Sequence, residues 1–447
     1  MFSVDHLAAR LDAFAEREGR PPSICVAASG GSDSTALLHA ITRIDTLPPV
    51  RAVHVNHGLH EDAAEWAKSV AAFAAALGTD CQVVRAEVVQ AGQGPEAAAR
   101  EARYRAFDEQ LRDGEWLLLA QHRDDQAETL LLNLLRGSGT MGLAAMPPVR
   151  SFGRGRLVRP LLGVTREDLA AYAQAHKLPV VADPSNDNLG YDRNFLRQRV
   201  LPELHARWPS AGHSLARSAE LAGESQALLD ALAGEDLARL GNDAARLPVE
   251  LLLELDPARR RNLLRFACRR LQLGTPPHGK LAAIDRDVLR ASDSAQPAIR
   301  WSNAEIRRYR DVLYLGPALA SPIEFAGCLT PAQPVPLSAD LGSIALLPAK
   351  HDGIRARVAE AGLELRSRAG GEVLRCGPQG RRRRLKTLLQ ESSVLPWMRE
   401  RIPLLWSADR LVAVGDLWID SEFVEAGGYS VRWRGRPALT ASESAAK

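Results

Sequence analysis

The chain has 447 residues, which is too long for one ordinary hydrophobic core, so we expect two or three domains. With 46% hydrophobic and 25% charged residues and a net charge of only +3, its composition is that of a soluble globular protein. No apolar stretch is long enough to cross a bilayer, and the amphipathic, acid-containing N-terminus resembles neither a secretory signal nor a typical transit peptide. We therefore expect a cytoplasmic protein with no membrane partner.

The cysteines argue against two kinds of chemistry. The chain has five of them, Cys25, Cys81, Cys268, Cys328 and Cys376, with no C-x-x-C pair and no metal-ligand cluster. This scatter disfavours a disulfide framework and a sulfur-transfer enzyme that works through paired thiols. We expect buried, reduced core residues.

The first chemical motif follows a short apolar run. Ile24–Ala28 reads as a buried strand, and SGGSDS, residues 29–34, sets two glycines between hydroxyl side chains before a helical pattern begins. A strand, a glycine turn and a helix start gather backbone N–H groups, which attract anions. The stretch matches neither G-x-x-x-x-G-K-[ST] nor G-x-G-x-x-G. A turn in which Ser32 or Asp33 merely caps the helix is the alternative.

Strand and helix patterns alternate from residue 24 to about residue 200. The strand candidates are Ile24–Ala28, Ala52–Asn56, Gln82–Val88 and Trp116–Ala120, and the helical patterns are Ser34–Ile44, Glu61–Leu77, Pro95–Leu111 and Asp124–Leu135. This alternation predicts an α/β domain with a parallel sheet covered on both faces. Ligands of such sheets bind at the carboxyl ends of the strands, where the sequence has Ser29–Ser34, Asn56-His57 and His122–Asp125.

Acidic residues follow the fourth strand candidate. Asp125 and Glu128 are three residues apart and share a helix face, while Asp124 lies four residues before Glu128. Together these carboxylates could bind a cation. The alternative is a capping arrangement, because acids also favour a helix N-terminus without any ligand.

The rest of the chain predicts further domains. Residues 203–300 are rich in Ala, Leu, Arg and Glu and read as helical, residues 317–337 contain five prolines and read as a connection, and residues from about 350 read as a small α+β domain. We expect an α/β domain over residues 1–215, a helical domain over 216–320, a linker and domain start over 321–360, and a C-terminal domain over 361–440. The tail 440–447 is small and polar and is expected to fray.

The ordered set of motifs is specific. SGGSDS resembles the pyrophosphatase loop of the PP-loop enzymes, which split ATP between its α and β phosphates. The full set resembles tRNA(Ile)-lysidine synthetases: HVNHGL at 54–59, HRDDQAET at 122–129, LLRGSGTMGLAAM at 134–146, RPLL at 159–162, DPSN at 183–186, RNFLRQRVLP at 193–202 and a C-terminal segment at 370–405. The resemblance is strong over residues 20–215 and weak between that region and the C-terminal segment. It implies that the domain over 1–215 is the catalytic PP-loop domain, that the helical domain over 216–320 gives tRNA and substrate specificity, and that the domain over 361–440 binds tRNA.

The resemblance implies a reaction, its substrates and its cofactors. ATP adenylates the C2 carbonyl oxygen of cytidine-34 in the CAU anticodon of tRNA(Ile), and the ε-amine of L-lysine then displaces AMP to form lysidine. The implied ATP-binding residues are Ser29, Gly30, Gly31, Ser32, Asp33, Ser34 and Arg103, with Arg100 as a rival of Arg103. Asp33 and Asp124 would hold Mg²⁺.

The resemblance also assigns residues to lysine and tRNA. Asp125 and Glu128 match the residues that recognise lysine, and a site rich in carboxylate can accept the proton that its ε-ammonium must lose. Arg197, with Arg193 as its rival, would contact phosphate. The implied catalytic residues are thus Asp33, Asp125, Glu128 and Arg197.

The basic run Arg381, Arg382, Arg383 and Arg384 is expected to bind tRNA phosphates, although such runs are often solvated loops. Whether the protein forms a homodimer stays open at this stage. Two other functions also stay open at this stage: another PP-loop ATP pyrophosphatase, acting in tRNA thiolation or amidation, and a catalytically silent RNA-binding protein.

Overall fold

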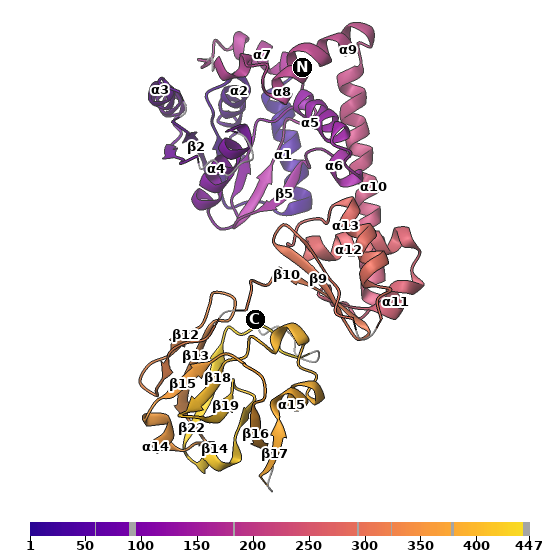
Figure 1. The fold of residues 1–447 in the computed structure, drawn as a ribbon. Coiled ribbons are helices and arrows are strands. Elements are labelled where there is room, and N and C mark those ends of the chain that lie inside the picture. Colours follow the sequence, from indigo (N-terminus) through magenta and orange to yellow (C-terminus); the bar gives the residue numbers. More distant parts are fainter. Residues whose placement is uncertain are drawn as a thin grey trace. The chain divides into compact units, whose positions relative to one another are not determined.

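The computed structural model describes residues 1–58, 60–88, 95–181, 184–292, 295–322, 324–376 and 380–440. The chain forms two compact units, Met1–Ala231 and Leu232–Lys447, and each is described by itself (Figure 1). The expected frayed tail lies almost entirely outside the described residues, as does Asp183 of the DPSN motif.

Unit 1 is built on a six-stranded sheet in the order β3-β2-β1-β4-β6-β5. All neighbouring strands are parallel except β5, which pairs antiparallel with β6. The strands are β1 (Ile24–Ala27), β2 (Val50–Asn56), β3 (Cys81–Arg85), β4 (Trp116–Leu118), β5 (Val149–Phe152) and β6 (Gly155–Val158). The predicted parallel α/β sheet is therefore confirmed, with a terminal hairpin that the sequence patterns did not indicate.

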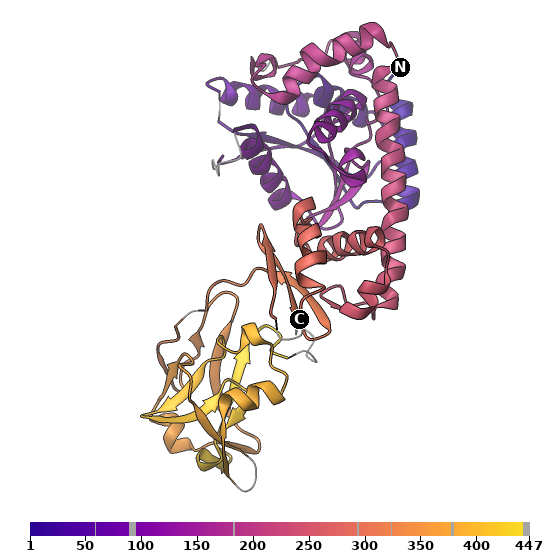
Figure 2. The same ribbon diagram turned by 45° about the vertical axis from the view of Figure 1, so that its right-hand side comes forward.

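Helices cover both faces of this sheet (Figure 2). The helices of unit 1, including α10 at its end, are α1 (Val4–Glu18), α2 (Ser32–Ile41), α3 (Ala63–Ala76), α4 (Pro95–Gln110), α5 (Arg123–Leu135), α6 (Thr140–Leu143), α7 (Arg166–Ala175), α8 (Asp192–Phe195), α9 (Leu201–Arg207) and α10 (Ala211–Arg239), with a 3-10 turn at Pro184–Asp187 and a π turn at Leu196–Val200. α10 contains the boundary between the two units.

Alternate strand residues supply two separate cores. Ile24 and Val26 of β1 pack in one cluster with residues of α1, α2 and α7, whereas Cys25 packs in another with Phe107 of α4. Successive side chains of a strand point to opposite faces, so a strand that is apolar throughout must be covered on both sides. Because β1, β2 and β4 are parallel, the loops that follow them lie at the same edge of the sheet.

The last turn of α2 contains a buried histidine. His39 is 5% exposed, its Nδ1 lies 2.9 Å from Tyr172 Oη, and its Nε2 accepts a hydrogen bond of 3.2 Å from Arg43 Nε. Because Nε2 is an acceptor, the ring proton is on Nδ1 and the imidazole is neutral. Burial and the nearby Arg43 charge lower the pKa of His39 from 6.5 to about 4.

This histidine makes the stability of unit 1 depend on pH. Below pH 6.5 the unfolded chain binds a proton at His39 that the folded chain excludes until about pH 4, so stability falls as pH falls through this window. We expect His39→Gln to reduce that loss by about 2 kcal/mol. Thermal unfolding at a series of pH values measures it, with exposed His213→Gln as the control, and equal pH dependence in both variants would contradict the assignment.

The first part of unit 2 combines helices with a sheet. It contains α11 (Val249–Glu254), α12 (Pro257–Arg270), α13 (His278–Ala283) and a π turn at Ile284–Val288, and a sheet in the order β7-β10-β9-β8. The strands are β7 (Arg246–Pro248), β8 (Ala298–Trp301), β9 (Ala304–Tyr309) and β10 (Val312–Pro317). The helices were expected; the sheet was not, because β7 and β8 have only three and four residues and β9 contains three charged residues among six.

The C-terminal part of unit 2 is mostly β structure around its own core. Its sheets have the orders β11-β15-β18-β19-β20 and β12-β13-β22-β14-β21, beside the hairpin β16-β17. The elements are β11 (Cys328–Leu329), β12 (Val335–Pro336), β13 (Ser343–Pro348), β14 (Asp352–Ile354), α14 (Ala356–Glu360), β15 (Leu363–Arg366), β16 (Val373–Cys376), β17 (Arg381–Arg384), α15 (Leu385–Glu391), β18 (Leu404–Ser407), β19 (Arg410–Val414), β20 (Trp418–Ile419), β21 (Val424–Ala426) and β22 (Tyr429–Arg434), with 3-10 turns at Pro396–Met398 and Ser421–Phe423.

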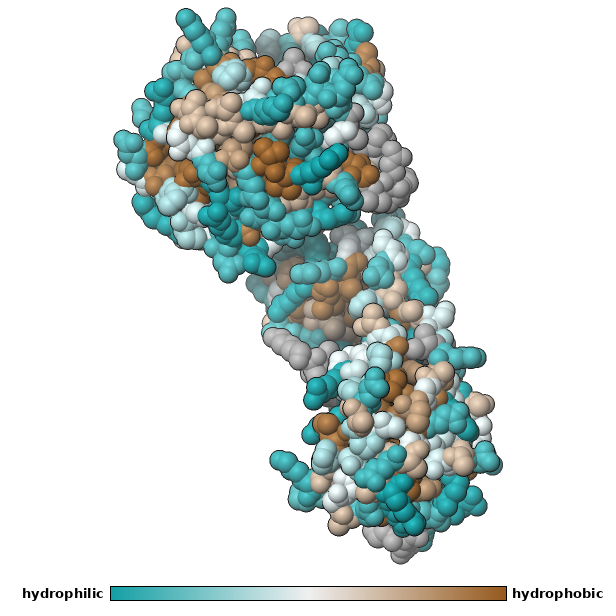
Figure 3. All heavy atoms as spheres, turned by 90° about the vertical axis from the view of Figure 1, so that its left-hand side faces the viewer, coloured by the Kyte–Doolittle hydropathy of each residue, from teal (hydrophilic) through white to brown (hydrophobic). Residues whose placement is uncertain are grey.

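Two expectations from composition can be compared with the structure. All five cysteines are free, as expected, but only Cys25 and Cys268 are buried; Cys81 and Cys376 are half-buried and Cys328 is exposed. Among the described residues, no helix combines the length and apolarity that a bilayer span requires. On the face drawn in Figure 3, the apolar side chains are interrupted by hydrophilic ones.

Candidate active site

The glycine loop joins β1 to the start of α2. Gly31 is the N-cap residue and no side chain caps the helix, so neither Ser32 nor Asp33 has the capping role of the alternative interpretation. Hydroxyl groups hold the loop instead: Ser34 Oγ donates to Gly31 O at 3.1 Å and accepts from Ser29 N at 3.1 Å. The first N–H groups of α2 have no carbonyl within the helix to bind and remain available to an anion.

Gly30 is the strained position of the loop. Its φ is +92°, and a Cβ built there would lie 2.9 Å from Val70 Cγ2 and 3.1 Å from Val181 Cγ2. Gly30 O also accepts a hydrogen bond of 2.9 Å from Val181 N. A side chain at this position would therefore push the loop away from both neighbours.

We expect Gly30→Ala to destabilise unit 1 by about 2 kcal/mol and to lower the rate of the ATP-dependent reaction at least tenfold, because the loop must shift. Gly19→Ala is the control, since Gly19 has a φ of +82° and a Cβ added there would have no neighbour within 4 Å. Thermal unfolding and ATP turnover are measured on both. Loss of activity in the Gly19 variant as well would mean that general strain, rather than the loop, is responsible.

His122 lies between three carboxylates. It is the N-cap residue of α5 and 1% exposed. Its Nε2 is 3.5 Å from Asp33 Oδ2 and 3.5 Å from Asp125 Oδ2, and its Nδ1 is 3.5 Å from Asp124 Oδ2. Burial lowers the pKa of His122, but its contacts with Asp124 and Asp33 outweigh burial and raise that pKa to about 9. An imidazolium thus links the glycine loop to α5 at neutral pH.

The metal assignment can be compared with this geometry. Asp33 Oδ1 is buried and has no hydrogen-bond partner among the described residues. A buried carboxylate oxygen without a partner is suited to binding a cation. Asp124 Oδ2 already accepts a 2.9 Å bond from Arg166 N and lies at the opposite ring nitrogen of His122. In the described part of the chain no cluster of three or more His, Cys, Asp or Glu residues could hold a metal. Mg²⁺ is often bound by one carboxylate with substrate phosphates, and Asp33 fits that role.

Asp125 has two tasks. Its Oδ2 accepts a hydrogen bond of 3.0 Å from His122 N, so Asp125 caps α5 together with His122 and not with Glu128, as the alternative from sequence had it. Its Oδ1 accepts bonds from Arg193 Nη2 at 3.2 Å and Arg197 Nη2 at 3.1 Å. The Asp125 side chain therefore both caps α5 and pairs with the guanidinium groups of Arg193 and Arg197.

Glu128 is fully buried beneath the two arginines. Arg193 Nε donates to Oε2 at 2.7 Å, and Arg197 donates from Nε to Oε1 at 2.6 Å and from Nη2 to Oε2 at 3.0 Å. Arg197 lies in the π turn, where such irregularities often mark functional sites. Both oxygens of Glu128 are thus in use, and lysine could reach them only if the arginines moved.

The remaining predicted phosphate ligand lies at the next strand end. Arg103 Nε donates to His57 Nε2 at 3.1 Å, and burial together with Arg103 lowers the pKa of His57 to about 4. Its rival Arg100 stacks on Tyr104 at 4.9 Å instead. Both arginines sit on α4, and only Arg103 meets a residue at the carboxyl end of β2.

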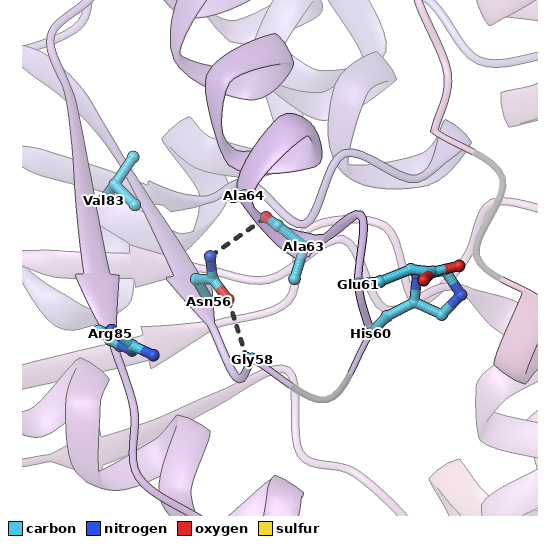
Figure 4. Close-up of a pocket in the computed structure, with 8 residues that line it drawn as sticks. All are labelled: Asn56, Gly58, His60, Glu61, Ala63, Ala64, Val83 and Arg85. Atoms are coloured by element: carbon cyan, nitrogen blue, oxygen red, sulfur yellow. Dashed lines mark hydrogen bonds between the residues drawn. The ribbon is translucent and has the colours of Figure 1, made fainter.

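A pocket of about 430 Å³ opens beside the carboxyl ends of β2 and β3 (Figure 4). Asn56 connects two parts of the pocket lining, because its Nδ2 donates a hydrogen bond to Ala63 O at 3.1 Å and its Oδ1 accepts one from Gly58 N at 2.8 Å. Arg85 and Glu61 also line it, and neither was singled out from sequence. The position of Arg85 at a strand end was the signal that could have identified it.

The structure gives His122 and Arg193 larger roles than the sequence assigns to them. From sequence, Arg193 is only a rival of Arg197, and His122 is only part of a polar strand end. Both arginines bind the same two carboxylates, Asp125 and Glu128, and which of the two arginines contacts phosphate stays a prediction. The four-residue spacing of Arg193 and Arg197 was the available signal.

The basic run forms the second strand of the hairpin β16-β17 in unit 2. Arg383 Nη2 binds both carboxylate oxygens of Glu391, at 2.6 and 2.7 Å. Arg381, Arg382 and Arg384 are exposed. Their positive charge is therefore more open to solvent than that of Arg383.

The fold and the loop define a class. A parallel sheet whose first strand leads through SGGSDS into a helix is the arrangement of PP-loop proteins, and residues 4–204 match the family model described as the PP-loop domain. Residues 247–314 match the model described as the TilS substrate binding domain, and residues 363–433 match the TilS substrate C-terminal domain.

Curated relatives then narrow the class to one family. The tRNA(Ile)-lysidine synthase of Xanthomonas campestris pv. campestris strain 8004 is 43% identical over 428 residues, which are 93% of this chain and 95% of that protein. The proteins of the same name from Alkalilimnicola ehrlichii and Pseudomonas aeruginosa are each 42% identical, over 92% of this chain and 93% and 92% of their own lengths. The chain belongs to the tRNA(Ile)-lysidine synthase family.

Proposed function

We propose that this protein uses ATP to join the ε-amine of L-lysine to C2 of cytidine-34 in the CAU anticodon of tRNA(Ile), with release of AMP and diphosphate in the cytoplasm. The observation that carries the proposal is the convergence of the glycine loop with the Asp33, His122 and Asp125 cluster at one edge of the sheet. Adenylation needs such a phosphate-binding loop beside groups that stabilise charge. Membership of the family supports the choice of tRNA and lysine.

The first step transfers charge to the leaving diphosphate. The N–H groups of the loop over Ser29–Ser34 and the start of α2 would bind it, with Arg103 as a further cation. A Mg²⁺ ion held by Asp33, and by Asp124 once His122 or Arg166 N yields, would neutralise the developing phosphate charge. The free Oδ1 of Asp33 supports this assignment.

The second step needs a lysine amine without its proton. Asp125 could hold the ammonium group and accept its proton, while His122, which is already protonated at neutral pH, would orient this carboxylate. Glu128 would act through Arg193 and Arg197, which it orients, and Arg197 would then face phosphate. In unit 2 the exposed Arg381, Arg382 and Arg384 would bind tRNA phosphates, while Arg383 is already paired with Glu391.

One assay separates this function from its alternatives. The protein is incubated with ATP, labelled lysine and tRNA transcripts that differ only in the first base of the anticodon. Label in the cytidine-34 tRNA(Ile) alone is the expected result. ATP consumption with no label in any transcript would favour another PP-loop reaction, and no turnover at all would favour a silent RNA-binding protein.

A further inference from the structure

A buried arginine lies at the carboxyl end of β6 without an acidic partner. Arg159 directly follows this strand, is 3% exposed, and donates hydrogen bonds to Pro147 O at 2.7 Å and to Gln121 Oε1. Both acceptors are neutral, and Arg159 forms no ion pair within the part of the chain that the structure describes. A buried charge is normally paired, because leaving it uncompensated away from water is costly. The charge of Arg159 is therefore available to an anionic ligand.

Two further arginines lie beside Arg159, around the ring of Tyr104. Arg100 Nη2 donates to Tyr104 Oη at 3.3 Å, and the guanidinium carbon of Arg150 lies 5.7 Å from the Tyr104 ring centroid. Neither Arg100 nor Arg150 forms an ion pair with a described residue. Burial lowers the pKa of Arg159, and the nearby charges of Arg150 and Arg100 lower it further, although Tyr104 opposes this effect. The positive potential of this cluster is thus not cancelled locally.

This Arg100–Arg150–Arg159 cluster borders the acidic part of the site. Gln121, which accepts from Arg159, directly precedes His122 at the start of α5. β6 runs parallel to its neighbour β4, so the residues that follow both strands lie at the same edge of the sheet. In the sheet order β2-β1-β4-β6, the glycine loop follows β1, the acids follow β4 and Arg159 follows β6. The acids therefore separate two cationic regions, of which only the first belongs to the phosphate-binding loop.

We propose that the Arg100–Arg150–Arg159 cluster binds the α-carboxylate of the lysine substrate and so selects an amino acid over a plain diamine. The inference rests on the proposed function, which supplies a substrate with two amino groups and one carboxylate. Asp125 attracts the ammonium groups but repels the carboxylate, which needs a cationic partner beyond the acids. Guanidinium groups suit that role, because they bind a carboxylate through paired N–H donors. The position of Arg159 beyond β4, on the side away from the loop at β1, favours the amino acid over ATP as the ligand.

The test compares L-lysine with cadaverine, which keeps both amino groups of lysine and lacks only its carboxylate. Transfer of labelled lysine to tRNA by the full-length protein gives the KM for lysine, and competition gives the Ki for cadaverine. Arg150→Gln should raise the KM for lysine about tenfold and leave the Ki for cadaverine unchanged, because only lysine loses a charged hydrogen bond. Arg150→Lys keeps the charge and should recover part of the affinity. Arg154→Gln is the matched control, since Arg154 is exposed in the turn of the same β5-β6 hairpin, at the opposite edge of the sheet.

The outcomes distinguish this inference from the function on which it rests. If lysine is transferred but Arg150→Gln changes both constants equally or neither of them, the subsite is refuted and the function stands. Calorimetry with ATP and without tRNA needs no transfer: a tenfold weaker Kd for lysine in Arg150→Gln than in Arg154→Gln, in a protein that transfers no lysine, would support the subsite and overturn the function. A protein that neither transfers nor binds lysine would overturn both. A change confined to inhibition by diphosphate would assign the cluster to that product and refute the proposal.

Discussion

Replacing Glu128 with Gln is expected to loosen the active site and to lower the rate of lysine transfer at least 100-fold. Glu128 is fully buried, and its two oxygens accept three hydrogen bonds from Arg193 and Arg197. An amide group cannot accept all of them, since its NH₂ would face guanidinium donors. Removing one partner of a buried ion pair leaves uncompensated charge and costs about 3 kcal/mol.

The local effect can be measured by hydrogen exchange. Backbone amides of α5 and of the π turn should exchange faster in Glu128→Gln, because these segments are joined through the carboxylate. Glu224→Gln, an exposed change on α10, is the control and should leave both segments unaltered. Normal exchange together with normal lysine transfer would show that Glu128 neither orients the arginines nor contributes to catalysis.

Features that depend on short stretches of chain could be predicted from the sequence. The strands from Ile24, Trp116 and their neighbours were predictable because an apolar run without alternation must be buried on both faces. Their polar ends were expected to meet at one edge of the sheet, and the contact between His122 and Asp33 shows that two of them do. Apart from these local patterns, the prediction of the site needed only the rule that ligands bind at the carboxyl ends of the strands in a parallel sheet.

The pairing of charges was not predictable in the same way. Asp125 and Glu128 looked like open carboxylates, yet Arg193 and Arg197 bind them from more than 60 residues further along the chain. Whether a carboxylate is free or paired depends on side chains brought together by the fold. For the same reason, nothing in the order of residues separates Arg383, which Glu391 neutralises, from its three basic neighbours.

The irregular sheet in the first part of unit 2 was missed for a related reason. Arg246–Pro248 and Ala298–Trp301 are too short and too polar to show a strand pattern by themselves. They become strands by pairing with β10 and β9, whose partners lie far away in sequence or across a tight turn. Composition could therefore indicate the helices of this region but not its sheet.

The largest effect is expected from Asp33→Asn, which should lower the rate of lysine transfer by about 10³-fold while the fold is retained. Asn has the shape of Asp but lacks its charge, so the group that would hold Mg²⁺ beside the phosphates is weakened.

The same change has a second readout that does not depend on turnover. Asp33 helps to raise the pKa of His122 to about 9, so the pKa of His122 should fall in Asp33→Asn, which NMR titration of the imidazole can follow. Asp45→Asn, an exposed change in the loop after α2, is the control and should alter neither quantity. A lowered pKa of His122 with full activity would mean that Asp33 only tunes the histidine. Full activity with an unchanged pKa would remove Asp33 from the site altogether, and the phosphate-binding role of the loop would lose its acidic partner.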